Sequence, residues 1–143
     1  MSTIDSKSVH VTRRIAASPE RVFEAWVSAA LLTQWLAPKA EADARPGGHF
    51  RLEVSTPEAV HVVSGEYREF VPGVRLVATW DYDGPMSPDG KMEALLTVEL
   101  RGDGAGTEVA VHHEHLTSPT YRDAIKSGAW TKALDKLEVL LGQ

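Results

Sequence analysis

The sequence of 143 residues contains no cysteine, no long apolar run and no excess of basic side chains. The missing thiols exclude disulfide bonds, thiolate metal sites and a cysteine nucleophile. Fifteen Lys and Arg stand against twenty Asp and Glu, so the formal net charge is −5, and nucleic acid or an anionic membrane is a poor partner for such a chain. No apolar stretch approaches the ~20 residues of a membrane-spanning helix. We therefore expect no nucleic-acid and no membrane partner.

The composition is that of a folded domain. Hydrophobic residues make up 43% and charged residues 24% of the chain, which is too apolar for a disordered protein. A chain of this length fits one domain and buries roughly 70% of its unfolded surface. We assign residues 9–143 to a single domain and expect residues 1–8 to be frayed or disordered. The polar start of the chain lacks the apolar segment of a secretory signal, so the expected location is the cytoplasm.

The first forty residues combine one strand with two short helices. Alternating apolar positions predict a strand over 9–16. Ser18-Pro19-Glu20 then marks a helix start, because Ser18 can cap free N–H groups and proline suits the first helical position. A second short apolar-periodic segment ends before Pro38, since proline disfavours continuation of a helix.

The middle of the chain is dominated by strands. Arg45-Pro46-Gly47-Gly48 is a turn signal with strand signals on both sides. Gly65 lies inside an apolar-alternating segment and predicts a bulge or sharp bend there. The strands expected after this turn cover residues 49–55, 60–71, 75–82, 92–100 and 107–115.

The C-terminal segment, residues 119–141, is predicted to be helical and roughly 35 Å long at about 1.5 Å per residue. Its apolar residues do not share one phase. Trp130, Leu134, Leu137 and Leu141 form one face, whereas Tyr121, Ile125 and Gly128 form another. We therefore expect the helix to kink, or to begin, near Ser127-Gly128.

This order of elements predicts an α+β fold. No helix separates the central strands, so the sheet must be antiparallel, with the helices on one side of it. A sheet of six or seven strands twists and curls. A long helix lying across the concave face of such a sheet would enclose a space.

Several segments, in this order and spacing, resemble one known family: the activator of heat-shock-protein-90 ATPase homologue-like domain of the START-like (SRPBCC, helix-grip) superfamily. The resemblance covers roughly residues 9–142. The segments that carry it are Ser18–Trp26, Leu32–Pro38, Arg45–Arg51, Gly65–Pro72, Arg75–Trp80, Gly106–Val109 and Gly128–Trp130. It implies a helix-grip fold with a deep cavity between a curved antiparallel sheet and a long C-terminal helix, and two short helices after the first strand.

Two departures from this family fall near the implied cavity. The chain reads Trp35-Leu36-Ala37-Pro38 where the family often has Trp-Trp-Gly-Pro, and Gly128-Ala129-Trp130 where it often has Gly-Trp. The family name does not by itself carry chaperone activation over, because short members resemble only the C-terminal domain of the eukaryotic co-chaperone.

Candidate ligand-binding residues are apolar or aromatic side chains on the predicted inner face, with His113 as a polar group. Tyrosine and tryptophan combine apolar area with one polar handle, which suits the orientation of a mostly apolar ligand. His113 could hydrogen-bond a ligand or act as a base. The expected wall residues are Trp35, Phe50, Tyr67, Trp80, Met92, His113 and Trp130.

The run His112-His113-Glu114-His115 is the densest polar cluster. Strand alternation predicts that His113 and His115 share one face. Two histidines so placed could bind a metal with a third ligand, but no residue of the sequence marks that ligand. We therefore assign no metal, no cofactor and no catalytic residue.

The favoured function is non-enzymatic binding of a hydrophobic small molecule, lipid- or polyketide-like, between sheet and C-terminal helix. One alternative is an enzyme of cyclase, aromatase, dehydratase or hydrolase type that uses the same cavity. Another is a chaperone- or stress-related interaction protein. A homodimer is compatible with the sequence, but no feature selects it.

Overall fold

The computed structural model describes residues 7–87 and 90–142. Most of the terminus expected to be frayed, residues 1–6, lies outside the described residues. Lys7 is described, and its carbonyl accepts a hydrogen bond of 2.9 Å from the Leu116 N–H. The elements, in chain order, are β1 (Val9–Ile15), α1 (Pro19–Val27), α2 (Ala29–Leu32), β2 (Lys39–Ala42), β3 (His49–Ser55), β4 (Val60–Val71), β5 (Arg75–Asp83), β6 (Met92–Gly102), β7 (Thr107–Glu114), α3 (Pro119–Ala124), η1 (Ile125–Ala129) and α4 (Trp130–Leu141).

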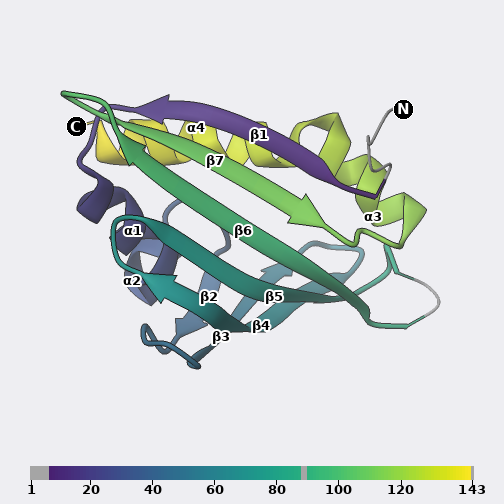
Figure 1. Ribbon diagram of the computed structural model, residues 1–143. Helices are drawn as coiled ribbons and strands as arrows, with labels where there is room; N and C mark the ends of the chain where they lie inside the picture. The colour runs from purple at the N-terminus through teal and green to yellow at the C-terminus, as the bar shows by residue number, and fades with distance from the viewer. Residues whose placement is uncertain (1–6, 88–89, 143) are drawn as a thin grey trace, which may run out of the picture.

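The strands form one curved, seven-stranded antiparallel sheet in the order β1-β7-β6-β5-β4-β3-β2. The helices lie on one side of this sheet (Figure 1). The α+β helix-grip architecture expected from the sequence is therefore confirmed. The strand signal before the Arg45–Gly48 turn corresponds to β2. This strand pairs with β3 and forms one edge of the seven-stranded sheet.

The irregularity of β4 lies beyond Gly65. The register with β5 shifts between Tyr67 and Glu69, so Tyr67 and Phe70 both turn toward the core side. Gly65 is required for a different reason. A Cβ there would lie 1.9 Å from the Thr79 carbonyl oxygen and 2.8 Å from Cε1 of Phe50. The glycine thus lets the Phe50 ring pass directly over the strand.

The first helix begins as its capping residues predict. Ser18 Oγ accepts a hydrogen bond from the Arg21 N–H, and Pro19 occupies the first helical turn. The helix buries Val22, Phe23 and Trp26 against the core. The two short helices are thereby fixed beside the sheet, at the end opposite α3 (Figure 1).

The C-terminal segment is a helix interrupted by one wide turn. The π-helical η1 contains Gly128 at φ +120°, so the predicted break near Ser127-Gly128 is confirmed. In an uninterrupted helix Tyr121 and Trp130 would point about 180° apart, at about 100° per residue. The wide turn changes this phase, and both side chains are buried.

The C-terminal helix is attached to the sheet edge by charged as well as apolar contacts. Arg13 on β1 contacts Asp135 at 2.7 Å and Glu138 at 2.9 Å. These two carboxylates raise the pKa of the Arg13 guanidinium. Leu134 and Leu137, which belong to the same helix, are fully buried. The α4 helix is therefore held along β1.

Candidate functional site

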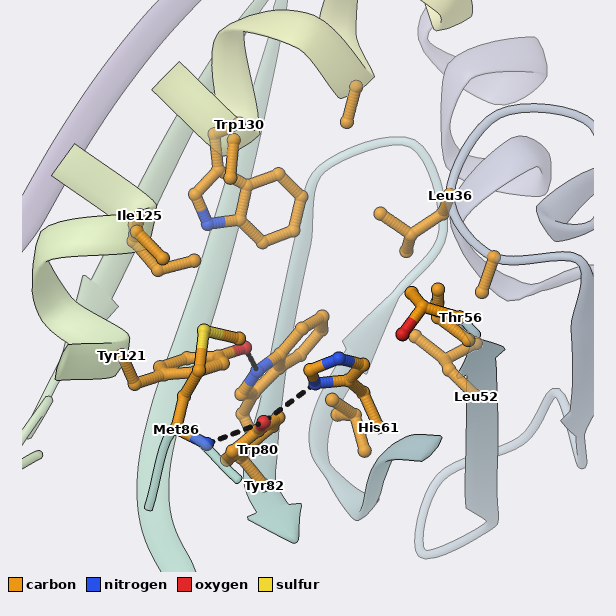
Figure 2. A pocket seen from close by; sticks show the side chains of 16 residues that line it. Leu36, Leu52, Thr56, His61, Trp80, Tyr82, Met86, Tyr121, Ile125 and Trp130 are labelled. Carbon is orange, nitrogen blue, oxygen red and sulfur yellow. Dashed lines mark hydrogen bonds between the residues drawn. The ribbon is translucent and has the colours of Figure 1, made fainter. Parts of the chain in front are cut away.

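A pocket of about 350 Å³ lies between the C-terminal helical segment and strands β3 to β5 (Figure 2). This volume falls at the lower end of the range of about 300–1,000 Å³ that is typical of small-molecule sites. Apolar side chains dominate its wall. The lining residues are Leu36, Ala37, Leu52, Val54, Thr56, His61, Val63, Trp80, Tyr82, Met86, Tyr121, Ala124, Ile125, Ala129, Trp130 and Ala133.

Each side of the pocket follows from the periodicity of its element. On the strands, alternate residues face inward, which brings Val63 and His61 of β4 beside Trp80 and Tyr82 of β5. On the helical side, the C-terminal segment has two apolar faces, one before and one after Gly128. The wide turn of η1 brings residues of both faces to one wall of the pocket. The predicted space between sheet and C-terminal helix is therefore present.

Hydrogen bonds orient two of the aromatic rings in this wall. The Trp80 indole N–H donates to the Tyr121 hydroxyl oxygen at 2.9 Å, which joins β5 to α3. The Trp130 indole N–H donates to Nδ1 of His113 at 3.0 Å, which joins α4 to β7. Burial raises the pKa of the Tyr121 hydroxyl, so this group is a neutral phenol. The rings are thus fixed rather than free to rotate out of the pocket.

His113 lies behind this wall rather than in it. Its ring is fully buried and meets Trp80 edge to face, with 5.1 Å between ring centroids. Burial lowers the pKa of His113 to about 3. At neutral pH the imidazole is therefore uncharged and a poor base, and its Nδ1 is occupied by Trp130.

One polar side chain that does face the pocket is His61. Its Nδ1 lies 2.7 Å from the Tyr82 hydroxyl oxygen, and this oxygen accepts a hydrogen bond of 3.2 Å from the Met86 N–H. Burial raises the pKa of Tyr82. Figure 2 shows the His61 ring projecting from β4 into the pocket, opposite the helical wall.

The loop that carries Met86 is connected to the helical side of the pocket. Ser118 Oγ, at the start of α3, hydrogen-bonds to the Met86 carbonyl oxygen. Met86 therefore bridges two contacts, one to β5 through Tyr82 and one to α3 through Ser118. Met86 lies at the end of the pocket at which His61 and Tyr82 meet (Figure 2).

The structure separates the seven predicted wall residues into three groups. Trp80 and Trp130 line the pocket. Phe50 and Tyr67, together with Trp80, line a neighbouring void of about 20 Å³. Trp35, Met92 and His113 are buried but line neither space.

The two spaces are separated by shared side chains. Leu36, Leu52 and Trp80 line both of them. Burial raises the pKa of Tyr67 to about 12, and its hydroxyl has no hydrogen-bond partner within the described chain.

Sequence reasoning missed His61, Tyr82, Tyr121 and Met86. A signal existed for two of them, because His61 alternates with Val63 and Tyr67, and Tyr82 shares the face of Trp80. Tyr121 and Met86 enter the wall through the phase change of the C-terminal helix and through a loop. The apolar periodicity of the sequence predicts neither of these two positions in the pocket wall.

The histidine cluster divides differently from the prediction. His115 lies beyond the end of β7 with φ +61° and is exposed, so it does not share the face of the buried His113. His112 lies on the other face, where its Nδ1 approaches Nδ1 of His10 at 2.5 Å. Among the residues that the structure describes, no group of three or more His, Cys, Asp or Glu side chains could hold a metal ion.

In residues 7–87 and 90–142, no helix combines the length and the apolarity needed to cross a membrane. No curated protein matches the chain. Solved structures do match. A protein from Rhodobacter sphaeroides has a TM-score of 0.80 and 26% identity, with 99% of this chain and 95% of that chain covered.

Two further structures share the fold at lower identity. CalU16 from Micromonospora echinospora has a TM-score of 0.71 and 24% identity, with 94% of this chain and 75% of that chain covered. DynU16, a protein of the dynemicin biosynthetic locus, has a TM-score of 0.73 and 20% identity, with 96% of this chain and 48% of that chain covered.

The family model of the activator of Hsp90 ATPase homolog 1-like proteins matches residues 16–142, which is nearly the whole described domain. The curved sheet, the gripped C-terminal helix and the pocket between them agree with this match. The chain therefore belongs to the activator of Hsp90 ATPase homolog 1-like family, with the START-like helix-grip fold.

Proposed function

We propose that the protein binds a hydrophobic small molecule, lipid- or polyketide-like, in the pocket between the sheet and the C-terminal helix. The observation that carries this proposal is a space of about 350 Å³ whose wall is apolar and aromatic on both its strand and its helix side. The fold is similar to that of DynU16, a protein of the dynemicin biosynthetic locus, and this similarity supports small-molecule binding as the proposed role.

The driving force is removal of apolar ligand surface from water. Burying about 200 Å² of such surface contributes roughly 5 kcal/mol before the cost of ordering, at about 25 cal/mol per Å². The rings of Trp80 and Trp130 are already fixed by hydrogen bonds to Tyr121 and His113. A ligand that stacks on them therefore pays little additional ordering cost in the protein.

Titration with N-phenyl-1-naphthylamine, an uncharged probe whose fluorescence rises in apolar surroundings, tests this proposal. We expect saturable binding of one probe per chain. Ala133 lines the pocket, so Ala133→Trp fills it and is expected to abolish binding. Thr131→Trp, at an exposed position of the same helix, is the matched control and is expected to leave binding unchanged.

Two results would contradict the proposal. One is the absence of saturable binding to the wild-type protein. The other is equal affinity of the wild-type protein and the Ala133→Trp variant, which would place the probe outside the pocket. Native mass spectrometry of the purified protein complements the titration, because a co-purified apolar molecule would appear as a mass increment.

The alternatives raised by the sequence stay predictions. An enzyme using His113 as its base is disfavoured by the lowered pKa of His113 and by its position behind Trp80. A chaperone- or stress-related role, a homodimer and a cytoplasmic location are likewise predictions. The exposed large apolar side chains of the described residues are Val60, Val71, Val74 and Val139.

A further inference from the structure

Among the residues that the structure describes, no charged side chain lines the pocket, although about a quarter of the sequence is charged. The titratable residues of the pocket wall are His61, Tyr82 and Tyr121, and burial raises the pKa of both tyrosine hydroxyls, which are uncharged at neutral pH. An ionised ligand would lose its hydration here without a compensating charge. The pocket is therefore suited to an uncharged molecule.

The hydrogen bonds around Tyr82 favour the tautomer of His61 that carries its proton on Nε2. The Tyr82 oxygen already accepts from the Met86 N–H. Its own proton needs an acceptor, and the Nδ1 lone pair of His61 lies 2.7 Å away. Neutral imidazole has one donor and one acceptor nitrogen, so acceptance at Nδ1 leaves the proton on Nε2.

The Nε2–H group of His61 is then a donor without a partner. No hydrogen bond from it is found within residues 7–87 and 90–142, and the ring projects into the pocket (Figure 2). Tyr121 is similar, because its oxygen accepts from Trp80 while its own proton has no acceptor among the same residues. The pocket thus presents unused donors in an otherwise apolar wall.

We propose that the ligand is a compact, uncharged, largely apolar molecule with a carbonyl-type oxygen that accepts a hydrogen bond from His61 Nε2–H. This inference rests on the proposed function and deepens it by naming the ligand class. The Met86–Tyr82–His61 chain is a positioning relay, in which the loop amide fixes the hydroxyl and the hydroxyl fixes the tautomer. Loss of the relay would free His61 to expose an acceptor instead of a donor.

A matched pair of probes tests the assignment. 6-Propionyl-2-(dimethylamino)naphthalene carries a ketone, and 6-propyl-2-(dimethylamino)naphthalene has the same ring system without it. His61→Phe keeps an aromatic ring and removes the donor. We expect this variant to bind the ketone about tenfold more weakly, the loss that corresponds to one hydrogen bond, while the affinity for the propyl analogue changes by less than about twofold.

His49→Phe is the control variant, because His49 is exposed and does not line the pocket. It is expected to leave both affinities unchanged. Equal losses of both probes in His61→Phe would mean that His61 contributes shape only, and unchanged ketone affinity would remove its role altogether. Either result overturns the inference while the N-phenyl-1-naphthylamine titration leaves the proposed function standing. Failure of that titration overturns both.

A measurement on the unmodified protein keeps the inference testable if His61→Phe does not fold. In nuclear magnetic resonance of protein labelled with ¹⁵N-histidine, we expect His61 Nδ1 to be unprotonated and Nε2 protonated at neutral pH. The Nε2–H resonance is expected to shift on addition of the ketone and to move much less with the propyl analogue. A proton on Nδ1, or equal shifts with both probes, would contradict the assignment.

Discussion

Trp130 donates a hydrogen bond of 3.0 Å to Nδ1 of His113, and this contact joins the first turn of α4 to strand β7. Both side chains are buried, so the bond connects the helical wall of the pocket to the sheet behind it. A buried donor and acceptor that satisfy one another remove a desolvation cost that either would carry alone. The pocket wall at Trp130 is therefore held by a specific pair rather than by packing alone.

Removal of the Trp130 indole N–H is expected to destabilise the fold. Trp130→Phe leaves the His113 acceptor buried without a partner, at a cost of about 1–3 kcal/mol in addition to the lost ring volume. Trp26→Phe is the matched control, because the Trp26 N–H is buried and has no partner within the described chain. Urea denaturation measures the difference. Equal losses of unfolding free energy in both variants would show that the Trp130 bond contributes nothing.

The buried His113 predicts a dependence of stability on pH. Its pKa is lowered to about 3 in the folded protein, whereas an unfolded histidine titrates near about 6.5. Between these values the unfolded chain binds more protons, so stability falls as pH falls below about 6.5 and is independent of this group above it. The slope for one proton is about 1.4 kcal/mol per pH unit.

His113→Asn isolates this contribution, since the amide oxygen can accept from Trp130 and the side chain does not titrate. We expect its unfolding free energy to fall less steeply than that of the wild-type protein between about pH 6.5 and pH 4. Urea denaturation at several pH values measures both slopes. Parallel curves would mean that His113 is accessible to protons in the folded state.

Gly65→Ala is expected to be strongly destabilising, because the new Cβ would lie 1.9 Å from the Thr79 carbonyl oxygen. Separation of the two strands, or displacement of Phe50, would cost about 1–3 kcal/mol or more. Gly102→Ala is the matched control, since its closest contact would be the Pro19 ring at 3.3 Å. Thermal unfolding measures both variants, and a similar melting temperature would contradict the close approach over Gly65.

Gly128→Ala tests backbone strain rather than space. No atom lies within 4 Å of a Cβ built at Gly128, but its φ of +120° disfavours any side chain. We expect a loss of about 1–3 kcal/mol and weaker N-phenyl-1-naphthylamine binding, because the helix would lose the turn that shapes the wall. Thr131→Ala, at an exposed position of α4, is the control and is expected to change neither. Unchanged stability of Gly128→Ala would show that the turn tolerates another conformation.

Local sequence signals determined most of the secondary structure. Ser18-Pro19 caps a helix through contacts within four residues, and the alternation of Leu76, Ala78, Trp80 and Tyr82 reports one buried face of one strand. The break near Gly128 was also predictable, because a phase change in apolar spacing is a property of the chain itself. Such features depend on neighbours in sequence.

The composition of the pocket was decided only by the tertiary structure. Apolar alternation marks which residues face inward, but it does not distinguish an inward residue that meets another side chain from one that meets empty space. His113 and His61 are both inward histidines. Trp80 and Trp130 cover the first, whereas the second lies where β3, β4 and β5 curve away from the C-terminal helix. That curvature sums small twists over several strand pairs, so it appears only when the whole sheet is assembled.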